Sequence, residues 1–291
     1  MKKTIYIFIA LLLGCFIFAI SYGLYIFNEV KAFQDKKYSK VITVYDWNKK
    51  EYPFILGPKN PRFVYWKNIS HYVKWAVILS EDAKFYKHSG VDIDAMKQAF
   101  KKNLEVGKYV RGGSTITQQL AKNVFLSREK TIIRKLKEIV IAFLIEAQLS
   151  KTRILELYLN AVEFGPLVYG IGHASNFYFG KSPAALNPLE AALLASLLPG
   201  PKIYNPYRKL ETVELRAKKI LKRMAEVKII SEEELNKYLN SSLTIGMERK
   251  IEVKMKEEPS IFGNLSSKPA FSNYSVKDRE ITLLELMSLQ N

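Results

Sequence analysis

Two adjacent carboxylates, Glu81 and Asp82, follow an apolar run from Trp75 to Leu79. The run is apolar on every side of a helix, so we expect this helix to be buried and the carboxylates to emerge at its C-terminal end. A helix C-terminus and a neighbouring negative charge both raise the pKa of a carboxyl group, which suits a general acid or base near neutral pH. On their own, these residues favour a simpler interpretation, a solvated helix end paired with nearby lysines.

A second candidate is the segment 112–119, Gly-Gly-Ser-Thr-Ile-Thr-Gln-Gln. Its two glycines let the backbone approach a ligand closely, and Ser114 or Thr115 can cap a helix that follows. Free N–H groups at such a helix start bind anions. Gln118 and Lys122, four residues apart, would share one face of the helix. The spacing is not that of a P-loop, and an ordinary glycine-led helix start is the alternative.

A third segment, 131–149, has a helical pattern that begins charged and becomes apolar on all sides. Arg134 and Glu138, four residues apart, would lie where this buried helix meets a cleft. Their simplest role is an ion pair that contributes roughly 0.2–0.5 kcal/mol. Three lysines lie close to the pair in the sequence: Lys130, Lys135 and Lys137.

The charge of the chain is strongly basic, with 45 Lys+Arg against 28 Asp+Glu and a net charge of +17 over 291 residues. Such an excess favours an anionic partner, whether nucleic acid, a membrane surface or a phosphorylated substrate. The region 111–153 holds nine basic and three acidic residues, which would compensate the charge of a diphosphate. The single cysteine, Cys15, excludes an intrachain disulfide, and the three scattered histidines lack the spacing of a zinc site.

The N-terminal residues 4–27 carry no charge and are dominated by Ile, Leu and Phe. As a helix they would extend ~36 Å, enough to cross a bilayer with some tilt. Lys2 and Lys3 precede them, which favours an N-terminus inside and the rest of the chain outside. A cleaved signal peptide would have a shorter apolar region and a small-residue cleavage site, so we expect an uncleaved transmembrane helix.

The remaining chain divides into regions of different pattern. Short β-like runs at 41–47 and 62–66 lie among prolines and glycines, and residues from about 70 to 239 have a helical pattern. Asn187 to Glu190 predicts the capped start of a helix, and Ser231 with Glu234 predicts another. The predicted fold class is mainly α, with one domain.

Together these segments resemble the glycosyltransferase family of penicillin-binding proteins, family 51, and most closely its monofunctional biosynthetic peptidoglycan transglycosylases. The resemblance extends over roughly residues 62–240, with the family's motifs in the expected order and spacing. The motifs are Glu81-Asp82-x-x-Phe85-x-x-His88-x-Gly90, Gly112 through Gln119, Arg134-Lys135-x-x-Glu138, Lys151 through Asn160, and a basic segment around Arg216.

The resemblance implies a lysozyme-like α fold and a division of the chain. We expect a cytoplasmic N-terminus (1–3), a transmembrane helix (4–27), a stalk (28–61), a glycosyltransferase domain (62–246) and a tail of unknown role (247–291). It also implies that the enzyme polymerises lipid II into β-1,4-linked glycan, with inversion and release of undecaprenyl diphosphate. About fifty residues remain after the domain, too few for a transpeptidase, so a monofunctional enzyme is expected.

The resemblance assigns a role to each motif residue. Glu81 is the general base that deprotonates the acceptor 4-hydroxyl. Glu138 is a second essential glutamate, which either binds a divalent cation (Mg²⁺ or Mn²⁺) or steers the leaving group; no organic cofactor is expected. The donor-site residues are Ser114, Gln118 and Gln119, and the diphosphate-contacting residues are Lys122, Lys130, Arg134 and Lys137. Two positions depart from the family, since Ala83 and Lys130 stand where arginine is common.

The expected partners are lipid II, the growing glycan chain, membrane lipids and other wall-synthesis proteins, but not nucleic acid. We expect a single-pass protein of the cytoplasmic membrane, with its N-terminus inside and its catalytic domain on the outer face. Two alternatives stay open: a lysozyme-like lytic enzyme, and an inactive membrane scaffold of the wall-synthesis machinery. Intact Glu81 and Glu138 argue against the scaffold.

Overall fold

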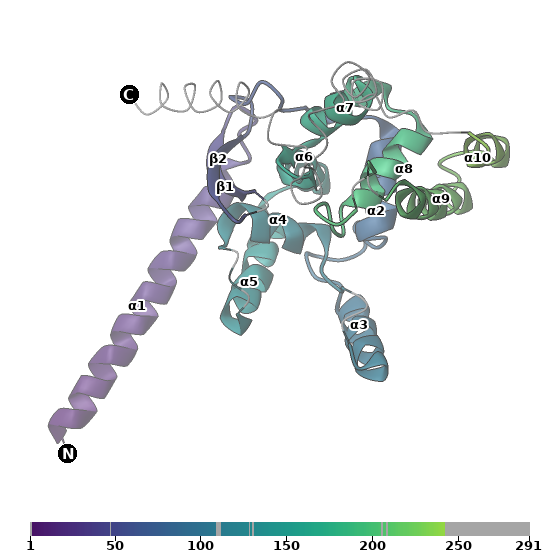
Figure 1. Ribbon diagram of the computed structural model, residues 1–291. Helices are drawn as coiled ribbons and strands as arrows, with labels where there is room; N and C mark the ends of the chain where they lie inside the picture. The colour runs from purple at the N-terminus through teal and green to yellow at the C-terminus, as the bar shows by residue number, and fades with distance from the viewer. Residues whose placement is uncertain are drawn as a thin grey trace, which may run out of the picture.

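The computed structural model describes residues 2–46, 48–108, 112–127, 129, 131–204, 206–207 and 209–241. It is mainly α, as predicted (Figure 1). Lys130 and the tail 247–291 lie outside the described residues.

The helices are α1 (Lys2–Ala32), α2 (His71–Glu81), α3 (Ile93–Val106), α4 (Ile116–Phe125), α5 (Ile132–Gln148), α6 (Lys151–Ala161), α7 (Ile171–Phe179), α8 (Pro188–Leu197), α9 (Leu210–Glu226) and α10 (Glu232–Leu239). The shorter elements are β1 (Lys40–Tyr45), β2 (Glu51–Leu56), η1 (Trp66–Asn68), β3 (Glu163–Gly165), β4 (Val168–Tyr169) and η2 (Pro183–Ala185).

The first helix, α1, is long and apolar enough over Thr4–Ala32 to cross a membrane. It extends five residues past the predicted end at Phe27, and these residues enter the globular part of the molecule. Ile26, Val30 and Phe33 are all buried there. The segment expected as a stalk, 28–61, therefore contributes side chains to the main hydrophobic core.

Hydrogen bonds also hold the end of α1 against the rest of the chain. Arg153 Nε donates to the carbonyl of Phe33 at 2.9 Å. Gln34 Nε2 donates to the carbonyl of Gln148 at 3.0 Å, and Gln148 Nε2 donates to that of Phe27 at 3.2 Å. The direction in which α1 leaves the domain is thus fixed from both α5 and α6.

A β-hairpin follows, in which β1 and β2 pair antiparallel from Lys40 opposite Leu56 to Tyr45 opposite Glu51. The first β-like run is confirmed, but the second, at 62–66, is wrong. Its Val64 N–H and C=O bond instead to the side-chain amide of Asn160, at 2.8 and 2.9 Å, so a side chain takes the place of a neighbouring strand.

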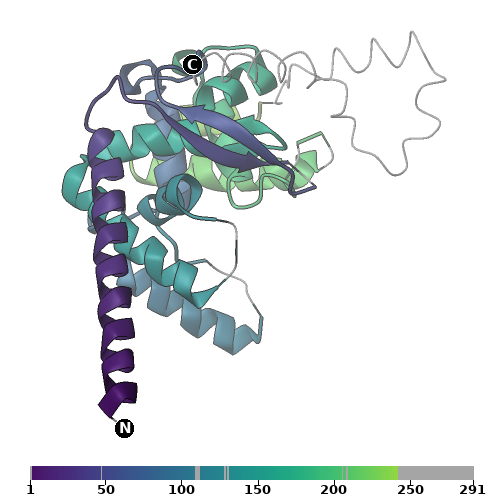
Figure 2. The ribbon, with the colours of Figure 1, turned by 90° about the vertical axis from the view of Figure 1, so that its left-hand side faces the viewer.

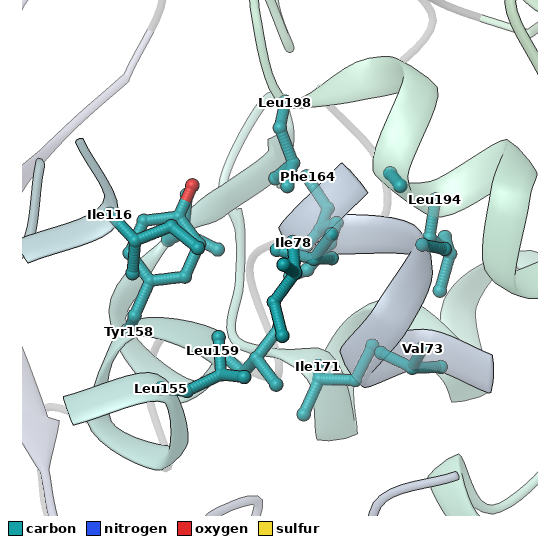
Figure 3. Close-up of a cluster of buried hydrophobic side chains, with 14 of the residues drawn as sticks. Val73, Ile78, Ile116, Leu155, Tyr158, Leu159, Phe164, Ile171, Leu194 and Leu198 are labelled. Atoms are coloured by element: carbon teal, nitrogen blue, oxygen red, sulfur yellow. The ribbon is translucent and has the colours of Figure 1, made fainter. Parts of the chain in front are cut away.

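The hydrophobic core includes buried side chains of α2, α6 and α8 (Figure 3). α2 packs against both α8 and α9. α8 is buried on every side, and its predicted capping box is present: Asn187 accepts from Glu190 N, while Glu190 accepts from Asn187 N. The predicted capping box of Ser231 and Glu234 is also present, at the start of α10. Local polar residues thus set the ends of helices whose apolar sides form the core.

α5 departs from the expected pattern. Its C-terminal half was expected to be buried all round, but only the side bearing Glu138, Ile141 and Ile145 packs against the domain. The opposite side, which is apolar, is exposed along the whole helix. The exposed large apolar side chains of α5 are Ile132, Ile133, Leu136, Val140 and Phe143, and those of α3 are Ile93, Phe100, Leu104 and Val106. α3 and α5 lie on the side of the molecule toward which α1 extends (Figures 1 and 2).

Replacing Phe33 tests whether the end of α1 belongs to the core. Phe33 is 2% exposed, so Phe33→Ala should lower the free energy of unfolding by about 3–5 kcal/mol and lower the melting temperature of the purified full chain. Phe18→Ala removes an aromatic ring that is 73% exposed on the same helix, and should change stability by less than about 0.5 kcal/mol. Equal effects of the two changes would contradict the burial described here.

Candidate active site

Glu81 is the last residue of α2, and its side chain is partly exposed. Its Oε2 accepts a hydrogen bond from Gln119 Nε2 at 2.8 Å. Burial raises the pKa of Glu81, against the opposing effects of hydrogen bonds from Gln119 and Ser80 and of the charges of Arg216 and Lys122. The predicted direction of the shift is therefore confirmed, but its main cause is desolvation and not the helix end or the neighbouring carboxylate.

Asp82 is the C-cap of α2 and is buried. Its carboxylate lies 2.9 and 3.0 Å from His88 Nε2 and accepts the backbone N–H of Ile116 at 3.0 Å. These contacts join the loop 82–90 to the first turn of α4. Asp82 thus positions the elements around Glu81.

The start of α4 is a capping box. Thr115 Oγ1 accepts from the N–H of Gln118 and donates to the carbonyl of Gly90 at 2.6 Å. Gly113 lies against α3, where a Cβ atom would approach Met96 Cα to 2.9 Å. A side chain at position 113 would therefore push the loop away from α3.

The two glutamines of this segment face different surroundings. Gln118 is fully buried, and its Oε1 accepts the N–H of Thr115 at 3.0 Å, so in the structure it holds the helix start. Gln119 is partly exposed and faces Glu81. Lys122 is exposed, whereas Gln118 is not, so the two do not share an exposed face as expected. A donor-site role for Gln118 stays a prediction.

A cluster of opposite charges lies at the start of α5. Glu138 is buried and forms ion pairs with Arg134, at 2.8 Å, and with Lys135. Lys135 Nζ also donates to Ser114 Oγ at 2.9 Å. Ser114 and Gln119 belong to the same helix start, so Glu81 and Glu138 flank the first turn of α4 from opposite neighbours, α2 and α5.

Lys135 is a residue that the sequence did not single out, although its spacing of three from Glu138 was visible. Lys137, which was singled out, instead places its Nζ 5.1 Å from the centre of the Tyr22 ring on α1. It therefore lies beside the first helix, and its contact with a diphosphate stays a prediction. Lys130, also expected to contact diphosphate, lies outside the described residues.

A divalent cation does not fit the surroundings of Glu138. Both of its carboxylate oxygens are engaged by the cations Arg134 and Lys135. Over the described part of the chain, no group of three or more His, Cys, Asp and Glu side chains is placed to hold a metal ion. Its contacts instead hold the cationic side chains of Arg134 and Lys135 in place, and a role in steering the leaving group stays a prediction.

Arg216 of α9 is a further residue whose role the sequence left undefined. Its Nε donates to the carbonyl of Ser196 at 3.0 Å, and its guanidinium lies 4.3 Å from the centre of the Tyr204 ring. Its charge lowers the pKa of Glu81, as does that of Lys122. A positive charge from α9 and one from α4 therefore both act on the Glu81 carboxylate.

Known proteins share these segments. A family described as transglycosylase matches residues 50–225, more than half of the chain. The chain belongs to the transglycosylase family. It is 51% identical over 161 residues to a biosynthetic peptidoglycan transglycosylase of Alcanivorax borkumensis, and the match covers 55% of this chain and 66% of that relative. A protein of the same description from Herminiimonas arsenicoxydans is 44% identical over 181 residues, covering 60% of this chain and 78% of the relative.

Among solved structures, penicillin-binding protein 1A of Haemophilus influenzae is 22% identical, with a TM-score of 0.39. That match covers 78% of this chain and 25% of the larger protein.

Replacing Asp82 tests its positioning role. Asp82→Asn removes the charge that accepts from His88 and Ile116, and should lower the free energy of unfolding by about 1.5–3 kcal/mol, measured by thermal or denaturant unfolding. Asp94→Asn is the matched control, because Asp94 forms an exposed ion pair with Lys84 at 3.4 Å. The control should change stability by less than about 0.5 kcal/mol. An Asp82→Asn protein as stable as the control would contradict the role.

Proposed function

We propose that this chain is a peptidoglycan glycosyltransferase that polymerises lipid II into β-1,4-linked glycan strands. The observation that carries the proposal is the Glu81 carboxylate, whose pKa is raised by burial and which lies beside the cations Lys122 and Arg216. The relatives' description as biosynthetic peptidoglycan transglycosylases supports the same reaction.

In the proposed reaction, Glu81 accepts the proton of the 4-hydroxyl of the acceptor sugar. The 4-hydroxyl oxygen then attacks the anomeric carbon of the donor with the electron pair of its broken O–H bond. The bond from that carbon to the diphosphate oxygen breaks. The anomeric configuration inverts, and the lipid diphosphate leaves with the bonding electrons. A carboxyl group with a raised pKa is a stronger base than an ordinary one, which suits the removal of a hydroxyl proton.

The departing diphosphate would be stabilised by cations around the first turn of α4. Lys122 lies on α4 itself, and Arg134 and Lys135 are held on α5 by Glu138. Ser114 Oγ accepts from Lys135, which keeps this lysine next to the helix start. Because two ion pairs fix their positions, these cations need little reorganisation as negative charge develops on the leaving group.

The proposed location is the outer face of the cytoplasmic membrane, with α1 as the anchor and the N-terminus inside. The apolar sides of α3 and α5 are exposed on the side of the molecule toward which α1 extends (Figure 2). Exposed apolar surface of this extent is stabilised by contact with lipid. Such contact would place the helix α5, and with it Glu138, close to the level at which a lipid-linked diphosphate lies.

Replacing Glu81 tests the proposed function. Glu81→Gln should abolish lipid II polymerisation, measured as long glycan chains and released undecaprenyl diphosphate, because the amide accepts no proton. It should also raise the melting temperature at neutral pH. A raised pKa makes the folded state bind more protons than the unfolded state, so the Glu81 carboxylate contributes less stability as pH rises through that pKa. The amide of the variant does not ionise, so the variant does not lose this stability as the pH rises.

The control for this test is Glu105→Gln, since Glu105 is exposed on α3. It should leave both polymerisation and melting temperature unchanged. Polymerisation by Glu81→Gln at the wild-type rate would refute the assignment of the base. Cleavage of preformed glycan without polymerisation by the unaltered protein would favour a lytic enzyme, and neither activity would favour a scaffold.

Cysteine labelling tests the proposed orientation. The only native thiol, Cys15, lies in α1 and is replaced by serine. In that background, a thiol at Lys219→Cys on α9 should react with a membrane-impermeant maleimide on spheroplasts. A thiol at Lys2→Cys should react only after the membrane is permeabilised. The reverse pattern would place the domain in the cytoplasm and rule out the proposed location.

A further inference from the structure

Tyr158 is a buried tyrosine of α6 that the reaction described above does not use. Its side chain is fully buried in the hydrophobic core (Figure 3). Burial raises the pKa of Tyr158 well above its ordinary value, and the nearby carboxylates Glu81 and Asp82 raise it further. The hydroxyl is therefore protonated at neutral pH and available as a hydrogen-bond donor.

The Tyr158 hydroxyl has a defined acceptor. It donates to Gln119 Oε1 at 3.1 Å, and Gln119 Nε2 in turn donates to Glu81 Oε2 at 2.8 Å. The Gln119 amide thus has its oxygen toward α6 and its nitrogen toward α2. If the amide were turned over, its oxygen would face the ionised Glu81 carboxylate, which has no proton to donate, and this hydrogen bond would be lost. The Tyr158 hydroxyl can donate or accept, so it holds the far end of the Gln119 side chain in place.

Resting on the proposed function, we propose that Tyr158 is a positioning residue that acts through Gln119 to hold the Glu81 carboxylate in its reactive orientation. The hydroxyl holds the oxygen end of the Gln119 amide, and the nitrogen end of the amide occupies Glu81 Oε2. Among the residues that the structure describes, the other oxygen, Oε1, has a long contact with Ser80 Oγ, at 3.4 Å, and is left to accept the proton of the acceptor hydroxyl.

Other charges around Glu81 come from several elements, and none of them replaces this contact. Arg216 on α9 and Lys122 on α4 lower the pKa of Glu81 through their charges, and Asp82 follows it in the chain. These charges act on the Glu81 carboxylate without fixing where the Gln119 side chain lies. Within the described part of the chain, the Tyr158 hydroxyl is what holds the end of that side chain away from Glu81.

The test is Tyr158→Phe in the full chain, because phenylalanine keeps the ring in the core and removes only the hydroxyl. We expect kcat for lipid II polymerisation to fall about tenfold with KM changed less than about twofold, since the base is misoriented while the substrate contacts remain. The acid limb of the pH dependence of kcat should move to higher pH. Without its hydroxyl partner the Gln119 side chain is held at one end only, and the hydrogen bond that lowers the pKa of Glu81 weakens.

The matched control is Tyr178→Phe. Tyr178 is another buried tyrosine, and its hydroxyl donates to the carbonyl of Phe164 at 3.0 Å. This change removes the same group from the core and should lower the melting temperature without moving the pH dependence of kcat.

A second variant, Gln119→Leu, removes the amide between Tyr158 and Glu81 and should also move the acid limb of the pH dependence of kcat to higher pH. The double variant Tyr158→Phe with Gln119→Leu should then lose no more than Gln119→Leu alone, because both changes break one chain.

A Tyr158→Phe protein with wild-type kcat and an unmoved acid limb would overturn the proposal, as would additive losses in the double variant. Should Tyr158→Phe not fold, Gln119→Leu with an unmoved acid limb would overturn it equally. These outcomes differ from failure of the proposed function, which would show as polymerisation by Glu81→Gln.

Discussion

The rest of the site depends on the hydrogen bonds to Asp82, the joint between the end of α2 and the start of α4. A buried carboxylate needs partners for its oxygens, and here they are the ring of His88 and the backbone N–H of Ile116. The joint fixes the end of α2 against the beginning of α4. Because Glu81 precedes Asp82 and Gln119 lies one turn into α4, the same joint brings the candidate base and its hydrogen-bond donor together. It also sets where Ser114 meets the cations of α5.

The fourth motif, in α6, acts mainly on the fold. Arg153 binds the chain after α1, Glu156 accepts the backbone N–H of Trp66 at 2.5 Å, and Asn160 binds both polar groups of Val64. These three side chains are buried. They bind backbone groups of the turn after α1 and of the segment that leads into η1. A motif shared with a family of enzymes therefore serves here to fasten the chain between the anchor and the site, with Tyr158 as its link to Glu81.

The sequence was informative where a property depends on neighbours along the chain. Helix caps such as Ser231 with Glu234 follow from a spacing of three, and the end of α2 follows from its apolar run. Properties set by packing were not accessible. Lys135 and Lys137 are two positions apart on one helix and point in different directions, and only the placement of α1 and α4 shows which of them meets Ser114. The exposed side of α5 was misjudged because an apolar pattern does not distinguish a protein neighbour from lipid. The second strand was missed because Pro53 lies within it.

If α1 crosses a membrane as proposed, its junction with the domain determines how the molecule responds to the thickness of the bilayer. A transmembrane helix accommodates a thinner or thicker bilayer largely by tilting. A flexible hinge would absorb such tilting, but Val30 and Phe33 lie in the core and Arg153 holds the backbone beyond them. Any tilt of the anchor must then turn the whole domain as one body. Lipid composition would thereby set the angle and height at which the reacting groups meet the membrane surface.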